Sequence, residues 1–308
     1  MQQKKYKGVV VPAVTPLASP TANRLSLDAE AVERMFANFR QHQVMPFILG
    51  TTGEAASLPQ SIKQDYLKVA ARVKQAGDVL YAGISSNIME ESVLFAKQSF
   101  DAGVDVVVAT LPNYYPLTPG EMKTYFERLA DAVGGPLMIY NIPPTVHMSI
   151  PLEVVEALSH HPNIVGLKDS ERSEERLQAA LQLSANRADF VYFAGWAAQS
   201  AASLLKGGDG IIPSTGNVAP GLYSELYKAA LGGNETKANA LQKTSDVLGN
   251  IYQGGKTLGE SLWALKVLMK KEGLCETHMM PPLYQLSSEE EQKVLTAWEA
   301  VVSTGATK

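Results

Sequence analysis

Eight short apolar runs alternate with longer amphipathic segments from the start of the chain to about residue 217. The runs are continuous, without strict alternation of apolar and polar positions, which is typical of strands buried on both faces of a parallel sheet. They occupy residues 9–14, 45–50, 79–85, 104–111, 136–142, 164–168, 190–195 and 210–214. The pattern therefore predicts eight strands, each followed by a helix.

The segments between the runs have helical periodicity. In residues 26–42, Ser26 precedes the expected helix and Glu30 lies in its first turn. Apolar side chains recur there at helical spacing, as Val32, Met35, Phe36 and Phe39. Residues 62–76 predict a second helix between the next two runs.

The order of these elements predicts the fold class. Eight strand–helix units of about 20 to 35 residues match an α/β fold of the (β/α)8 TIM-barrel type better than a doubly wound sheet. No GxGxxG motif follows the first run, which removes the main reason to choose a Rossmann fold. Beyond residue 230 the pattern is wholly helical. We therefore expect a catalytic barrel over 1–230 and a helical extension, packed on it, over 231–308.

Composition and charge narrow the class of protein. Of 308 residues, 45% are hydrophobic and 19% charged, which excludes a disordered chain. A net charge of −4 makes nucleic acid and anionic membranes poor candidates as partners. One cysteine, Cys275, can form no internal disulfide, so a cytoplasmic location is expected. Four prolines in 132–152 argue against a membrane helix, and Pro12 and Pro16 argue against a signal peptide.

Polar side chains end four of the predicted strands, where the active sites of such barrels lie. The GTTGE turn at 50–54 holds Thr51 and Thr52, and it offers backbone N–H groups and hydroxyls to a carboxylate. Tyr114 follows the fourth run, in a loop bounded by prolines. Tyr140 and Lys168 end the fifth and sixth runs.

Lys168 is the most informative of these residues. A lysine is almost never buried without a reason, because desolvation disfavours the ammonium form. At a strand end facing the barrel mouth its pKa should fall, leaving a neutral amine that attacks a carbonyl and forms an imine. Tyr140, on the adjacent strand, could transfer protons, with Thr51 and Tyr114 linking it to solvent. Alternatively, Lys168 pairs with Asp169 or Glu171 at the rim and has no catalytic role.

Together these motifs resemble the dihydrodipicolinate synthase/N-acetylneuraminate lyase family of Schiff-base, pyruvate-dependent lyases. The order of the motifs and the spacing of 28 residues from Tyr140 to Lys168 carry the resemblance. The matching segments are VPAVTP (11–16), GTTGEAASL (50–58), AGVDVVVATLPNYYP (102–116), YNIPP (140–144), IVGLKDS (164–170) and GGDGIIPSTGNVAP (207–220).

The resemblance implies roles for individual residues. Lys168 is expected to form the imine with the substrate, and Tyr140 to shuttle protons. Thr51 and Thr52, with Gly50 at the start of their turn, are expected to hold the pyruvate carboxylate. Tyr114 corresponds to a relay tyrosine delivered by a neighbouring subunit, so the site needs at least a dimer. The family's usual assembly implies a homotetramer built from two dimers. Ile212 corresponds to a residue whose backbone carbonyl faces the substrate. Neither a metal nor an organic cofactor is expected.

Departures from the family pattern bear on the substrate. Dihydrodipicolinate synthases carry an arginine shortly after the catalytic tyrosine, where this chain has Thr145 and no arginine from 132 to 168. Sialic acid lyases place acidic residues after the seventh strand, where this chain has Trp196, Ala197 and Ala198. The expected partners are a keto acid (pyruvate) and an aldehyde. Candidates for contact with the second substrate are Thr145, Ser214, Thr215, His147 and Asn113.

The sequence therefore predicts a lyase that cleaves a 2-keto-3-deoxy acid reversibly into pyruvate and an aldehyde. A dihydrodipicolinate synthase proper and a keto-acid dehydratase of the same family are the enzymatic alternatives, since both use the same imine. A non-catalytic barrel that senses a keto acid is the alternative from another class.

Overall fold

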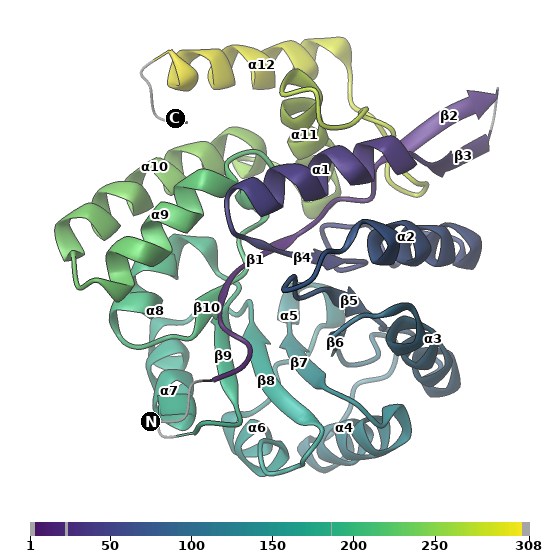
Figure 1. Ribbon diagram of the computed structural model, residues 1–308, viewed down its shortest axis with the longest axis vertical. Helices are drawn as coiled ribbons and strands as arrows, with labels where there is room; N and C mark the ends of the chain where they lie inside the picture. Colours follow the sequence, from purple (N-terminus) through teal and green to yellow (C-terminus); the bar gives the residue numbers. More distant parts are fainter. Residues whose placement is uncertain (1–3, 22–23, 186, 304–308) are drawn as a thin grey trace.

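The computed structural model describes residues 4–21, 24–185 and 187–303 of the chain. Eight parallel strands form a closed barrel in which the first strand pairs with both the second and the last (Figure 1). This confirms the (β/α)8 prediction. The barrel strands are β1 (Gly8–Pro12), β4 (Met45–Ile48), β5 (Tyr81–Gly83), β6 (Val106–Ala109), β7 (Leu137–Asn141), β8 (Ile164–Asp169), β9 (Val191–Ala194) and β10 (Gly210–Ile211).

A helix follows each barrel strand and packs on the outside of the sheet (Figure 1). A short helical turn, α5 (Pro143–Val146), lies between β7 and the helix that covers it. The eight outer helices are α1 (Ala29–Gln41), α2 (Gln60–Val73), α3 (Met89–Ala102), α4 (Pro119–Val133), α6 (Leu152–Leu158), α7 (Glu174–Ala185), α8 (Ser200–Leu205) and α9 (Pro220–Leu231).

Two cores explain why the strand sequences are apolar at every position. In β6, Val107 and Ala109 pack in the layer between the sheet and the helices. Val106 and Val108 alternate with them and pack in the barrel interior, together with Phe47. Because successive side chains of a strand point to opposite faces, both faces need apolar residues.

The structure adds a hairpin that the sequence pattern did not predict. Strands β2 (Leu17–Thr21) and β3 (Arg24–Leu27) pair antiparallel between β1 and α1. Ser26 lies in this hairpin, and α1 is capped by Asp28, whose side chain accepts a hydrogen bond from the backbone N–H of Ala31. The first helix therefore begins two residues later than a cap at Ser26 would place it.

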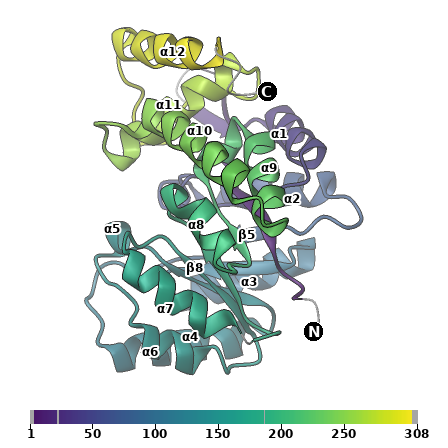
Figure 2. The same cartoon turned by 90° about the vertical axis from the view of Figure 1, so that its left-hand side faces the viewer.

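Three helices follow the barrel: α10 (Glu235–Gln253), α11 (Leu258–Lys271) and α12 (Ser288–Val302). Helix α10 packs against α8 and α9, and α11 packs against α10 and α12. Figure 2 shows the three helices gathered at one end of the molecule. The division of the chain at residues 230 and 231 stays a prediction. In the described part of the chain, no helix has the length and apolar character needed to cross a membrane.

The end of β5 lies directly against the chain that leaves β4. A Cβ atom added to Gly83 would overlap the carbonyl oxygen of Leu49. We therefore expect Gly83→Ala to lower the free energy of unfolding by about 2 kcal/mol or more, through overpacking. Gly120→Ala is the matched control, because a Cβ at Gly120 meets no atom within 4 Å. Chemical denaturation of both variants checks this, and equal stability of the two would contradict it.

Candidate active site

Lys168 and Tyr140 meet inside the barrel mouth. They are direct partners in the pairing of β8 with β7, and their side chains are 3% and 5% exposed. The Lys168 Nζ atom lies 3.8 Å from the centre of the Tyr140 ring and 5.0 Å from that of Phe47. Tyr140 and Phe47 both belong to the barrel-interior core. The amine of Lys168 is therefore held against aromatic carbon.

This environment changes the acidity of both groups. Burial lowers the pKa of Lys168 from its usual value, and the nearby Tyr140 oxygen raises it part of the way back. Burial alone would raise the pKa of Tyr140. The positive charge of Lys168 and hydrogen bonds with Thr51 and Ser170 outweigh burial, so the pKa of Tyr140 is lowered. The Lys168 amine therefore loses its proton more readily than an ordinary lysine does, and the Tyr140 phenol is more acidic than an ordinary tyrosine.

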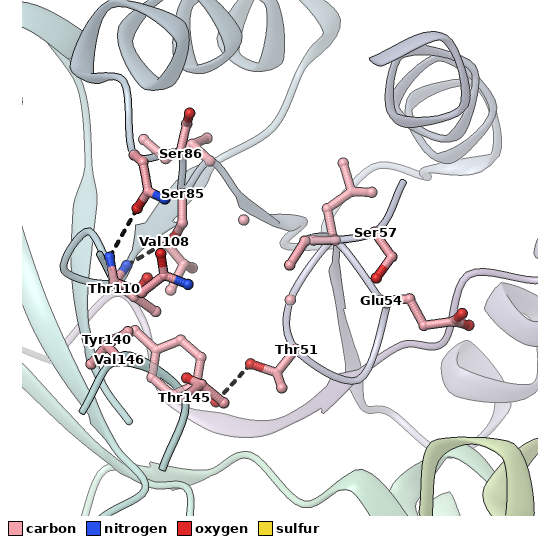
Figure 3. A pocket seen from close by; sticks show the side chains of 18 of the residues that line it. Thr51, Glu54, Ser57, Ser85, Ser86, Val108, Thr110, Tyr140, Thr145 and Val146 are labelled. Atoms are coloured by element: carbon pink, nitrogen blue, oxygen red, sulfur yellow. Dashed lines mark hydrogen bonds between the residues drawn. The ribbon is translucent and has the colours of Figure 1, made fainter. Parts of the chain in front are cut away.

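The turn after β4 brings Thr51 to the same place. Its Oγ1 atom lies 3.5 Å from the Tyr140 hydroxyl, and Figure 3 shows the two side chains facing each other. Thr52, the next residue, is buried. Within the described part of the chain, the backbone N–H groups of Thr51 and Thr52 donate to no acceptor. Free amides beside hydroxyls suit an anionic group.

A hydrogen-bond network on the outer face of the same two strands fixes their ends. Asn141 donates to Asp169 and to Glu171, at 2.9 Å each, and Arg176 donates to Asp169 at 2.7 Å. Within the described residues, Asp169 and Glu171 form their ion pairs with Arg176 and Lys168 forms none, so the rim pairing of Lys168 is wrong, whereas its catalytic role stays a prediction. Sequence reasoning missed this network, although Asn141 and Asp169 directly follow Tyr140 and Lys168.

A pocket of about 550 Å³ opens above the strand ends. Gly50, Thr51, Tyr140 and Thr145 line one part of it, and residues of α11 contribute apolar side chains. Lys168 lies behind this lining, in contact with the Tyr140 ring. Polar residues of the loops after β5 and β6 line another part: Ser85, Ser86, Asn87, Thr110 and Asn113.

The remaining predicted residues lie in different surroundings. Ile212 is buried in the barrel-interior core. Ser214 bonds at 2.7 Å to the hydroxyl of Tyr252 on α10. Tyr114 is 77% exposed and packs edge-on against the exposed ring of Tyr115. Within the described residues, none of these three lines the pocket, and neither do His147 and Thr215. Their predicted contacts with substrate stay predictions.

Comparison with known proteins places the chain among enzymes of one family. A sequence model of the Dihydrodipicolinate synthetase family matches residues 5–301. A 4-hydroxy-tetrahydrodipicolinate synthase of Methanosarcina barkeri is 28% identical, covering 92% of this chain and 95% of the relative. A probable 2-dehydro-3-deoxy-D-pentonate aldolase of Escherichia coli is 29% identical, with 94% and 96% covered.

Solved structures of dihydrodipicolinate synthases are also similar to this chain. The dihydrodipicolinate synthase of Bacteroides thetaiotaomicron superposes with a TM-score of 0.90 at 26% identity, covering 97% of this chain and 99% of that one. That of Acinetobacter baumannii, complexed with pyruvate, has a TM-score of 0.85 at 25% identity, with 96% and 98% covered. The fold and these relatives define a (β/α)8-barrel lyase. More particularly, the chain belongs to the Dihydrodipicolinate synthetase family.

The mutual influence of Lys168 and Tyr140 can be measured directly. Tyr140→Phe removes the phenol oxygen that raises the pKa of Lys168 and keeps the ring that buries it. The pKa of Lys168 should therefore fall further, and its titration midpoint should move to lower pH. NMR of the Lys168 Cε resonance, assigned with Lys168→Met, checks this. An unchanged or higher midpoint would contradict it, and the other lysines serve as internal controls.

Proposed function

We propose that the chain is a Schiff-base-forming lyase that cleaves a 2-keto-3-deoxy acid reversibly into pyruvate and an aldehyde. The observation that carries the proposal is the amine of Lys168, buried at a strand end with a lowered pKa and in contact with Tyr140. A desolvated amine loses its proton more readily and becomes a nucleophile for a carbonyl carbon. The complex of the Acinetobacter relative with pyruvate supports pyruvate as the keto acid.

The chemistry follows from these two groups. The neutral amine of Lys168 adds to the C2 carbonyl of the keto acid, and the resulting carbinolamine loses water to give a protonated imine. That imine accepts the electron pair of the C3–C4 bond as the bond breaks. The C4 hydroxyl loses its proton, and the aldehyde leaves. The enamine then takes a proton at C3, and hydrolysis releases pyruvate.

Tyr140 and the turn after β4 serve these steps. The Tyr140 hydroxyl, next to the amine, transfers the protons that carbinolamine formation and loss of water require. Thr51, 3.5 Å from that hydroxyl, extends the path. The free amides of Thr51 and Thr52 receive the substrate carboxylate. The protonated imine itself is the electron sink, so the reaction needs no metal or organic cofactor.

The pocket lining favours an aldehyde without a carboxylate over the second substrate of a dihydrodipicolinate synthase. Thr145 lines the pocket where such a synthase has its arginine, and no arginine lines it within the described residues. The lining cation is Lys63, whose charge interacts with Glu91. A second carboxylate would therefore lack a bidentate partner. The pentonate aldolase relative is consistent with this preference.

The imine is the first result to establish. Incubation with pyruvate and borohydride should add one pyruvyl-sized mass to the intact chain, because borohydride reduces the imine to a stable amine. Lys168→Ala should take up no mass and should lose turnover by at least about a thousandfold. The control is Lys63→Ala, which removes another lysine near the pocket and should still be labelled. A labelled Lys168→Ala variant would overturn the proposal.

The two enzymatic alternatives form the same imine, and the sensor alternative has no turnover. Analysis of the products therefore separates all of them. On a panel of 2-keto-3-deoxy sugar acids we expect pyruvate and an aldehyde. A dehydrated keto acid would instead show a dehydratase. Consumption of pyruvate with aspartate semialdehyde would show a dihydrodipicolinate synthase. An adduct without turnover of any panel member would show a keto-acid sensor.

We also propose that Tyr114 acts in the site of a neighbouring chain in a cytoplasmic homotetramer of two dimers. In the single chain its ring is largely exposed, next to the equally accessible Tyr115. Two adjacent exposed aromatic rings favour a contact between proteins over a surface left to water.

Subunit mixing tests the role of Tyr114. Lys168→Ala and Tyr114→Phe should each have little activity alone. In a hybrid dimer, the site with an intact Lys168 receives the intact Tyr114 of its neighbour. Random mixing should therefore restore about a quarter of the wild-type activity. No recovery in mixtures that are shown to exchange subunits would place Tyr114 in its own chain's site.

A further inference from the structure

A fully buried ion pair joins the turn after β4 to the helices that follow the barrel. The Lys266 side chain on α11 donates to Glu54 Oε1, and both side chains are 0% exposed. The two residues are 212 positions apart in the sequence. Lys266 also donates to the carbonyl of His278, at 2.7 Å. Neither charge takes part in the imine chemistry proposed above.

Glu54 ends the same turn that carries Thr51 and Thr52. Its second carboxylate oxygen accepts a hydrogen bond from the backbone N–H of Met280, at 2.9 Å, so both oxygens are occupied. Its own backbone N–H donates to the carbonyl of Thr51, at 3.1 Å. Figure 3 shows its side chain directed away from Thr51 and Tyr140. The Glu54 carboxylate therefore links the turn to α11 and to the segment after it, on the side of the turn that faces away from Thr51 and Tyr140.

The turn needs such support because its backbone is strained. Leu49, before it, and Glu54, at its end, have φ angles of 57° and 56°. Residues other than glycine rarely adopt this left-handed region, and they keep it only where surrounding contacts enforce it. On the inner side, Thr15 donates to the carbonyl of Gly53. On the outer side, the carboxylate of Glu54 supplies the contacts.

Stability alone explains the pair poorly. Desolvating two charges offsets much of their attraction, so apolar residues of similar volume stabilise a core about as well. A hydrogen-bonded charged pair differs from apolar packing because its directional hydrogen bonds fix the orientation of both side chains. Here the fixed atoms adjoin a turn in which the Thr51–Tyr140 contact is already 3.5 Å long. A small displacement of the turn would break that contact.

We propose that Glu54 and Lys266 are positioning residues, which set the carboxylate-binding turn of the active site from the helical extension. The assignment rests on the proposed function in one respect, namely that Thr51 and Thr52 receive the pyruvate carboxylate. Loss of the pair should loosen the turn, weaken pyruvate binding and leave the reactivity of Lys168 largely unchanged.

The decisive variant replaces both charges. Either Glu54→Gln or Lys266→Met alone leaves a buried charge without its partner and threatens the fold. The double variant Glu54→Gln, Lys266→Met contains no such charge and should keep an unfolding temperature close to that of the wild type. Lys266→Arg keeps the charge but changes the shape of the donor, and it provides a second folded test. The control pair is Lys271→Met with Glu299→Gln, which removes an exposed ion pair between α11 and α12.

Two readouts are taken on each variant. The first is borohydride trapping over a range of pyruvate concentrations. It gives the concentration at half-maximal trapping and, separately, the maximal trapping rate. In the double variant this concentration should rise about tenfold while the maximal rate changes less than about threefold, with a smaller rise for Lys266→Arg. The second is backbone hydrogen exchange without ligand, which should quicken in peptides covering 50–57 but not in those of β7 and β8. The control pair should change neither.

The outcomes separate this inference from the proposed function. A folded double variant, or a folded Lys266→Arg, that keeps both the wild-type exchange and the wild-type half-saturation would overturn the positioning role. The role would also be overturned if the unfolding temperature and the maximal trapping rate both fell as the half-saturating pyruvate concentration rose. General destabilisation would then explain all three changes. If the wild type forms no pyruvate adduct, the proposed function fails, and exchange at 50–57 alone decides whether the pair positions the turn.

Discussion

The site depends on the pairing of β7 with β8, which sets Lys168 beside Tyr140 with both side chains buried. Parallel pairing puts the two residues at the same height, and closure of the barrel surrounds them with Phe47 and other interior side chains. A lysine amine on the protein surface would remain charged at neutral pH. Here the low-dielectric surroundings disfavour the charge, and the phenol beside it offers a short path for a proton.

The outer face of the same strands explains how this arrangement keeps its geometry. Asn141 and Asp169 alternate with Tyr140 and Lys168 and bond to each other across the strand pair. Lys168 and Tyr140 on the inner face thus have a hydrogen-bonded pair on the outer face, one residue further along each strand. Arg176 ties this outer pair to α7. Side chains on strands that are fixed in this way are held more tightly than side chains on loops.

The sequence predicted the parts of the molecule that local patterns encode. Strands buried on both faces leave continuous apolar runs, so all eight were found, and Lys168 and Tyr140 stood out as polar ends of such runs. The hairpin of β2 and β3 was missed because its strands have only five and four residues, and β2 (LASPT) is rich in small and polar types, although the four residues of β3 (RLSL) do alternate. The partnership of Glu54 with Lys266 could not be foreseen, since nothing local links residues so far apart in the chain. The hydrogen-bond network on the outer face could have been predicted, because the strand period of two places Asn141 and Asp169 on the face opposite to Tyr140 and Lys168.

The contribution of α11 to the pocket has a consequence for synthesis of the protein. The last barrel strand ends at Ile211, whereas Leu258 and Leu262, which line the pocket, follow much later in the chain. At about 5 to 20 residues per second, a ribosome needs several seconds to translate that interval. A nascent chain can therefore complete all its barrel strands while its active site still lacks a wall. The pocket above the strand ends therefore gains its α11 wall only late in synthesis, after all the barrel strands have been made.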